Sequence, residues 1–128
     1  MTQPTKFSSK SRLGSFINAT RGIKFLLVTQ PNVWLHSLAT LTVCVAGLLL
    51  RLSNTEWCFL VLCFVSVWTT EALNTALEVL TDIVSPDFHP LAGRAKDVAA
   101  GAVLIAALGS VIVGAIVFVP HILRLATQ

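Results

Sequence analysis

Four polar side chains that could do chemistry follow one another along an otherwise apolar stretch of the sequence. They are Glu71, Asn74, Glu78 and Asp82, at offsets of 0, 3, 7 and 11 residues. In an α-helix these offsets place all four within an arc of about 80° on one side. Carboxylates so close together repel one another, and partial burial is unfavourable unless cations compensate. We expect such a stripe to bind a metal, bind a cationic partner or move protons.

A cluster that supplies such cations follows the acidic stripe. After a Ser-Pro-Asp turn signal come His89, Gly93, Arg94, Lys96 and Asp97, directly before the next apolar run. Gly93 permits close approach of the backbone to a ligand. Arg94 and Lys96 can meet phosphate oxygens, while Asp97 can hold a metal-bound water or orient the lysine. Carboxylates for Mg²⁺ beside cations for phosphate are what phosphoryl transfer requires, and without a Walker A motif the site would not be a P-loop.

The composition indicates what kind of element carries these residues. Of the 128 residues, 55% are hydrophobic and only 12% are charged, whereas a soluble domain carries about 25% charged residues. A chain this short could not bury so much apolar surface in one core. We therefore predict an all-α membrane protein with a single domain covering residues 1–128 and no nucleic-acid partner.

The second of three apolar runs is too short to cross a membrane by itself. Residues 57–70 are 14 in number, or about 21 Å of helix, against a hydrocarbon core of about 30 Å. The helix must therefore continue through Glu71. We predict membrane spans over about 32–51, 56–84 and 96–122, with Glu71 in the membrane half of its helix and Asp82 nearer to water.

The N-terminal segment, about residues 11–29, differs from the spans because it mixes basic and apolar side chains. Arg12, Arg21 and Lys24 stand among apolar residues that gather loosely on one helical face. Long basic side chains can extend toward water while their stems contact lipid, so we predict an amphipathic helix at the membrane surface.

The distribution of basic residues predicts the orientation. Seven lie before the first span or before the third, and two lie on the other side. The positive-inside rule then places the N-terminus and the loop over residues 85–96 in the cytoplasm, and the C-terminus outside. We expect this arrangement in a bacterial cytoplasmic membrane. Small residues at intervals of three and four in the third span favour a tight bundle and an oligomer.

The acidic stripe and the cluster after it resemble a known family. Glu-Ala-Leu-Asn-Thr-Ala-Leu-Glu-Val-Leu-Thr-Asp, from Glu71, and His-Pro-Leu-Ala-Gly-Arg-Ala-Lys-Asp-Val-Ala-Ala-Gly-Ala-Val, from His89, closely resemble the prokaryotic integral-membrane diacylglycerol kinases. That family includes the undecaprenol kinases of Gram-positive bacteria. The resemblance extends from about Ser15 to Leu123.

The resemblance implies an ATP- and Mg²⁺-dependent kinase of a membrane lipid hydroxyl, that of diacylglycerol or undecaprenol. It also implies a homotrimer with sites between neighbouring protomers. By residue-to-residue match, Glu71 is similar to the catalytic base, Asn74 to the group that supports the reacting atoms, and Glu78 to the metal ligand. The matches to nucleotide-contacting positions are Asp82, His89, Gly93, Lys96 and Asp97.

Two positions depart from the family pattern. Gln30 stands where many members carry a second metal-ligating glutamate, and Trp34 stands where an arginine is frequent. Glutamine is a neutral and weaker ligand for a hard cation, so the metal site is expected to be shifted, weakened or differently built.

Two other classes of function stay open on the sequence. A small proton-coupled transporter would use Glu71 as its intramembrane carboxylate but would give the remaining polar residues no role. A catalytically impaired family member acting as a membrane scaffold would account for Gln30. Binding of ATP that requires Glu78 and Lys96 would count against the transporter, whereas metal-dependent ATP affinity would separate the scaffold from an active kinase.

Overall fold

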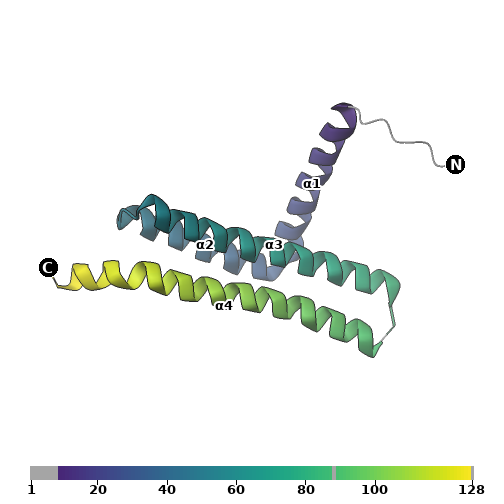
Figure 1. Cartoon of the computed structure of the whole chain (residues 1–128). Helices are drawn as coiled ribbons and strands as arrows, with labels where there is room; N and C mark the ends of the chain where they lie inside the picture. Colours follow the sequence, from purple (N-terminus) through teal and green to yellow (C-terminus); the bar gives the residue numbers. More distant parts are fainter. Residues whose placement is uncertain (1–8, 88, 128) are drawn as a thin grey trace.

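The described part of the protein is a bundle of three apolar helices with an N-terminal helix attached at an angle (Figure 1). The computed structural model describes residues 9–87 and 89–127. Its elements are α1 (Ser9–Thr29), α2 (Pro31–Leu49), α3 (Asn54–Val84) and α4 (Pro90–Ala126) (Figure 1). The described residues form no strand. Helices α2, α3 and α4 are long and apolar enough to cross a membrane, so the predicted all-α membrane fold is confirmed.

A proline separates the N-terminal helix from the bundle. Pro31 is the first residue of α2, and Gln30 before it is extended, with φ −101° and ψ 116°. A proline disfavours a helical conformation of the preceding residue, so the chain changes direction there. Helix α1 consequently leaves the bundle at a steep angle (Figure 1), as expected of a surface helix.

The turn between α2 and α3 is built by a helix end and a helix start in close succession. Arg51 adopts a φ of 54°, and the N–H of Leu52 donates to the carbonyl of Gly47 at 3.1 Å, a pairing typical of helix C-termini. Ser53 then caps α3, and its side chain and that of Glu56 form a reciprocal capping box. These local contacts reverse the chain within a few residues.

Helix α3 is continuous from Asn54 to Val84 and has 31 residues. At 1.5 Å per residue it extends about 46 Å, enough to cross a bilayer and project beyond it. The prediction that this helix continues through Glu71 is therefore confirmed. Helix α4 runs antiparallel to it and contacts it along its length (Figure 1).

Helix α4 begins earlier than the predicted start near residue 96. Pro90 is its first residue, and the Nδ1 atom of His89 accepts a hydrogen bond from the N–H of Leu91 at 3.2 Å. A side-chain acceptor at the N-cap and a proline in the first turn both favour helix initiation. Gly93 and Lys96 therefore lie on the first turns of a helix, whereas the sequence had placed them in a loop.

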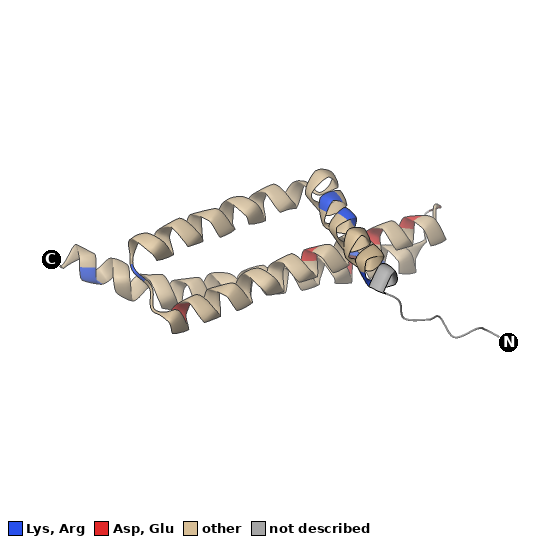
Figure 2. Ribbon diagram, turned by 90° about the horizontal axis from the view of Figure 1, so that it is seen from above, with Lys and Arg blue, Asp and Glu red and all other residues tan. Residues whose placement is uncertain are grey.

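The bundle keeps most of its large apolar side chains on its outer surface. Only a few apolar residues are buried, among them Leu52, Leu60 and Val117 at one end of the bundle, whereas long rows of leucine, isoleucine and valine are exposed on α2, α3 and α4. Lipid is the solvent that favours such a surface. Figure 2 shows the charges separated along the molecule, with a long uncharged stretch between them.

Candidate active site

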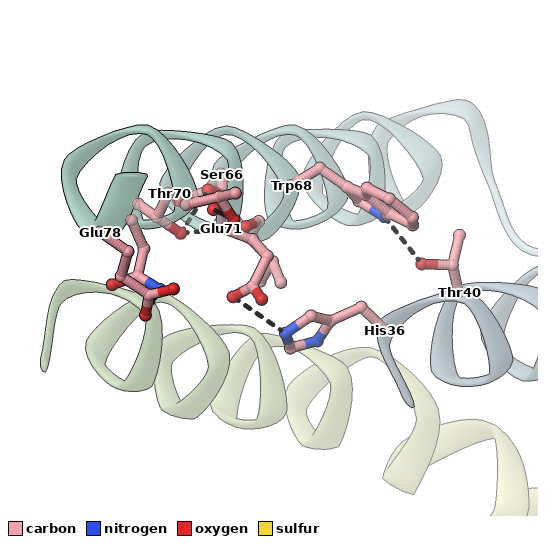
Figure 3. Close-up of polar contacts among 10 residues, drawn as sticks. His36, Thr40, Ser66, Trp68, Thr70, Glu71 and Glu78 are labelled. Atoms are coloured by element: carbon pink, nitrogen blue, oxygen red, sulfur yellow. Dashed lines mark hydrogen bonds and ion pairs between the residues drawn. The ribbon is translucent and has the colours of Figure 1, made fainter. Parts of the chain in front are cut away.

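Glu71 is, with Val33, one of the two most buried side chains among the described residues. Its side chain is 1% exposed on α3, and the Nε2 atom of His36 on α2 lies 3.8 Å from its Oε2 atom (Figure 3). Neither carboxylate oxygen has a hydrogen-bond partner among the described residues. Buried polar groups are nearly always hydrogen-bonded, so an unsatisfied buried carboxylate is a candidate functional group.

Asn74 and Glu78 form a linked pair one and two turns farther along α3. The Nδ2 atom of Asn74 donates to Glu78 Oε1 at 3.0 Å. Within residues 9–87 and 89–127, the Oδ1 atom of Asn74 is buried without a partner. The hydroxyl of Thr75 donates to the Glu71 carbonyl at 2.9 Å and so turns away from the pair. The arrangement leaves an amide oxygen and a carboxylate ready for a ligand.

A hollow of about 320 Å³ joins these side chains. Glu71, Asn74 and Glu78 line one side of it, and apolar residues of α4 line the other. The full lining consists of Asn32, Leu35, His36, Glu71, Asn74, Glu78, Ala100, Val103, Leu104 and Ala107. Three members of the acidic stripe therefore share one cavity wall, as the helical offsets predicted.

The fourth member of the stripe faces a different hollow. Lys96 Nζ donates to Asp82 Oδ1 at 2.5 Å, and both line a hollow of about 220 Å³ at the turn between α3 and α4. His89 and Gly93 line it as well. No described atom of another segment lies within 4 Å of the place where a Cβ on Gly93 would stand, so this wall is open to a ligand. Asp82 is about 16 Å along the helix from Glu71.

Three predicted site residues do not reach either hollow within the described chain. Arg94 and Asp97 are exposed on the first turns of α4, and neither of them lines the hollow that Gly93 and Lys96 line. Gln30 is partly buried at the N-cap of α2, where its side chain makes no capping hydrogen bond to the described residues. Their roles stay predictions.

The polar side chains of the site suit an Mg²⁺ ion bound mainly by the phosphates of a nucleotide better than a metal bound by protein side chains alone. Among residues 9–87 and 89–127, no three His, Cys, Asp or Glu side chains gather closely enough to hold an ion. Mg²⁺ commonly uses one or two carboxylates and completes its shell with waters and substrate phosphates. The Glu78 carboxylate with the unpaired amide oxygen of Asn74 fits that requirement.

The structure also brings in residues to which the sequence gave no role. His36 and Asn32 of α2 line the hollow with Glu71, and Asp87 lines the hollow with Asp82. His36 carried a usable signal, because an ionisable residue inside a membrane span is by default a candidate functional residue. Asn32 and Asp87 carried none, since polar residues at helix ends and turns are ordinary.

An apolar three-span bundle with carboxylates and an unsatisfied amide at one end defines a small integral-membrane protein with a polar site. The sequence profile of the prokaryotic diacylglycerol kinases matches residues 17–118. The chain therefore belongs to the prokaryotic diacylglycerol kinase family. The prediction that it is an enzyme, a lipid kinase of the diacylglycerol or undecaprenol kinase type, is confirmed.

Similar proteins cover the chain to different extents. An undecaprenol kinase of Bacillus subtilis is 40% identical over 108 residues, which are 84% of this chain and 88% of that protein. A diacylglycerol kinase of Synechocystis is 41% identical over 114 residues, 88% of this chain but 65% of that protein. A diacylglycerol kinase of Escherichia coli K12 is 42% identical over 55 residues, 43% of this chain and 45% of that protein.

Proposed function

We propose that this protein transfers the γ-phosphate of ATP, with Mg²⁺, to the hydroxyl of a membrane lipid. The single observation that carries the proposal is the buried Glu71 carboxylate, which has no hydrogen bond to the described residues and lines the same hollow as Glu78. A base and a metal ligand on one cavity wall are the groups that phosphoryl transfer to an alcohol needs.

Glu71 serves as the general base. A carboxylate at membrane depth meets a lipid hydroxyl without competition from bulk water. As the hydroxyl oxygen forms its bond to the γ-phosphorus, the O–H bond breaks and the proton passes to Glu71, while ADP leaves. Asn74, one turn away, orients the Glu78 carboxylate by the hydrogen bond at 3.0 Å and supports the reacting groups.

Glu78 would hold the Mg²⁺ that accompanies ATP, with the neighbouring amide oxygen of Asn74 as a second protein ligand. The ion would supply neutralisation of the charge that develops on the phosphoryl oxygens. Gln30 is the proposed further contact from α2, as a neutral and weaker ligand than a glutamate.

The hollow at the α3–α4 turn receives the nucleotide. Lys96 carries the positive charge for a phosphate and is held by Asp82, and Gly93 leaves room for the ligand. His89 lines the same wall. Arg94 and Asp97 are exposed on α4 and line neither hollow. We propose that a neighbouring copy of the chain completes the site beside them and that the active form is a homotrimer.

Undecaprenol is the proposed lipid, and diacylglycerol is the alternative. The support is the similarity to the undecaprenol kinase of Bacillus subtilis, which extends over most of that protein and most of this chain. We further propose a bacterial cytoplasmic membrane as the location, with the N-terminus and the active site on the cytoplasmic side and the C-terminus outside. The basic residues counted from the sequence support this orientation.

The test is phosphate transfer from labelled ATP by the purified protein in mixed micelles with Mg²⁺. Undecaprenol and diacylglycerol are offered separately, and the Glu71→Gln protein is the control. Transfer to one lipid, lost in the variant, is the expected result and names the substrate. If folded protein transfers phosphate to neither lipid, the proposal fails. That outcome, together with an ATP affinity that does not depend on the metal, would support the scaffold function instead.

A further inference from the structure

His36 faces Glu71 across the boundary between α2 and α3 (Figure 3). The Nε2 atom of the imidazole lies 3.8 Å from Glu71 Oε2, and the two side chains are 14% and 1% exposed. Within the described part of the chain, Nε2 and both carboxylate oxygens are buried without a hydrogen bond. Two orphaned groups of complementary chemistry therefore point toward each other.

A second contact keeps these helices in register. The indole N–H of Trp68 donates to Thr40 Oγ1 at 3.4 Å (Figure 3). Thr40 is four residues after His36 and Trp68 is three residues before Glu71, so each pair shares one helix face. The contact between Trp68 and Thr40 thus lies one turn away from the facing imidazole and carboxylate, and it fixes which side chain of α2 stands opposite Glu71.

The separation leaves the imidazole within reach of the carboxylate. A distance of 3.8 Å is too long for a hydrogen bond, so a direct bond requires a rotation about the side-chain bonds of one of the two residues. An ionised carboxylate removed from water needs a hydrogen-bond donor, and bonds to charged groups are the stronger kind. Both residues line the hollow that Glu78 also lines.

We propose that His36 is a positioning residue for Glu71. The imidazole N–H donates to Oε2 and holds the carboxylate so that Oε1 faces the hollow and accepts the proton of the lipid hydroxyl. The proposal rests on the proposed kinase activity. It assigns no contact with ATP to His36, so loss of the imidazole lowers kcat and leaves the KM for ATP unchanged.

Three substitutions at one position test this role. Glutamine places its amide nitrogen near the position of Nε2, asparagine ends one bond short of it, and leucine has no donor. We expect His36→Leu and His36→Asn to lower kcat by about tenfold to a hundredfold, the effect of losing a hydrogen bond to a charged group. We expect His36→Gln to retain most of the rate. His121→Gln, at the opposite end of the bundle, is the matched control with an unchanged rate.

A double variant separates positioning from a general structural effect. In the Glu71→Gln background, His36→Leu should cause no further loss, because coupled residues are not additive. The proposal is overturned if His36→Leu keeps the full rate, if asparagine rescues as well as glutamine, or if the leucine variant lowers the residual rate of Glu71→Gln again. An increase in the KM for ATP at constant kcat would also overturn it.

A spectroscopic readout keeps this inference apart from the kinase proposal. With histidine labelled by ¹⁵N, Glu71→Gln should shift the ring resonances of His36, while Glu56→Gln should shift those of His121 instead. If the wild-type protein transfers no phosphate, the proposed function fails, and the resonances still decide whether the pair exists. Unshifted His36 resonances in Glu71→Gln would overturn the pairing itself.

Discussion

The two ends of the bundle each carry a histidine near a buried or half-buried glutamate. They differ in whether the carboxylate of that glutamate has hydrogen-bond partners. At the closed end, His121 Nε2 lies 3.7 Å from Glu56, and Glu56 also accepts hydrogen bonds from the backbone and hydroxyl of Ser53 at 2.7 Å. At the open end, His36 lies at nearly the same distance from Glu71, but that carboxylate has no hydrogen bond within the described chain.

Packing differs in the same sense. The closed end has the apolar cluster of Leu52, Leu60 and Val117, joined by Trp57, and the hollow beside it is lined by apolar side chains and one threonine. The hollows at the open end instead have carboxylates in their walls. Satisfied polar groups and dense packing stabilise a fold, and unsatisfied groups beside space are what a ligand can use. The comparison supports a division in which one end holds the helices together and the other end carries the proposed active site.

The largest expected effect comes from removing the base. Glu71→Gln keeps the shape of the side chain but cannot accept the proton, so the rate of phosphate transfer should fall by at least about a hundredfold. The measurement is transfer from labelled ATP in mixed micelles. The matched control is Glu56→Gln at the closed end, which should keep the rate. Equal losses in both variants would contradict the division between the two ends.

The next effect concerns the metal. Glu78→Gln replaces the proposed carboxylate ligand of Mg²⁺ with a weaker one, so the Mg²⁺ concentration for half-maximal rate should rise by about tenfold to a hundredfold. Rates measured over a series of Mg²⁺ concentrations give this value. An unchanged Mg²⁺ dependence would remove Glu78 from the proposed metal site.

A smaller effect is expected at the nucleotide hollow. Lys96→Met removes the charge proposed to meet a phosphate and keeps the length of the stem, so the KM for ATP should rise by about tenfold. Initial rates over a range of ATP concentrations measure it. Arg124→Met, at the other end of α4, serves as the control. A variant with unchanged KM would mean that ATP binds elsewhere.

Stability should respond most at the closed end. A Cβ added to Gly47 would stand 2.9 Å from the ring of Trp57, and overpacking of this kind costs about 1–3 kcal/mol. Gly47→Ala should therefore unfold at a lower temperature, with activity retained below it. Gly109→Ala, where no described neighbour lies within 4 Å, is the comparison. Equal melting temperatures for the two variants would show that the Trp57 ring can move to make room for the added Cβ without a loss of stability.

The smallest effect is loss of the cap. Ser53→Ala removes the acceptor at the start of α3 and one partner of Glu56, which should lower the free energy of unfolding by about 1 kcal/mol. Thermal unfolding followed by circular dichroism measures the change. If kinase activity falls by more than the loss of stability explains, the cap at the closed end also affects the active site.

Much of the fold and part of the site could be predicted from the sequence. The extension of α3 through Glu71 followed from a run too short to cross a bilayer, and the shared face of Glu71, Asn74 and Glu78 followed from the period of the helix. The start of α4 at Pro90 was missed, because the cap by His89 depends on a side-chain geometry that hydrophobicity does not report. The roles of the individual site residues stay predictions.

The sequence was sufficient to specify the helices and to predict that the polar residues of α3 share one face. A backbone in lipid must satisfy its own hydrogen bonds, so apolar length alone indicates where helices run, and spacing of 3.6 residues per turn indicates which side chains share a face. Tertiary structure decided which groups meet. That His36 faces Glu71, that Asp82 pairs with Lys96 in a separate hollow, and that Arg94 lines neither hollow depend on how one helix packs against another. That packing is set by contacts between residues far apart in the chain, which no local pattern encodes.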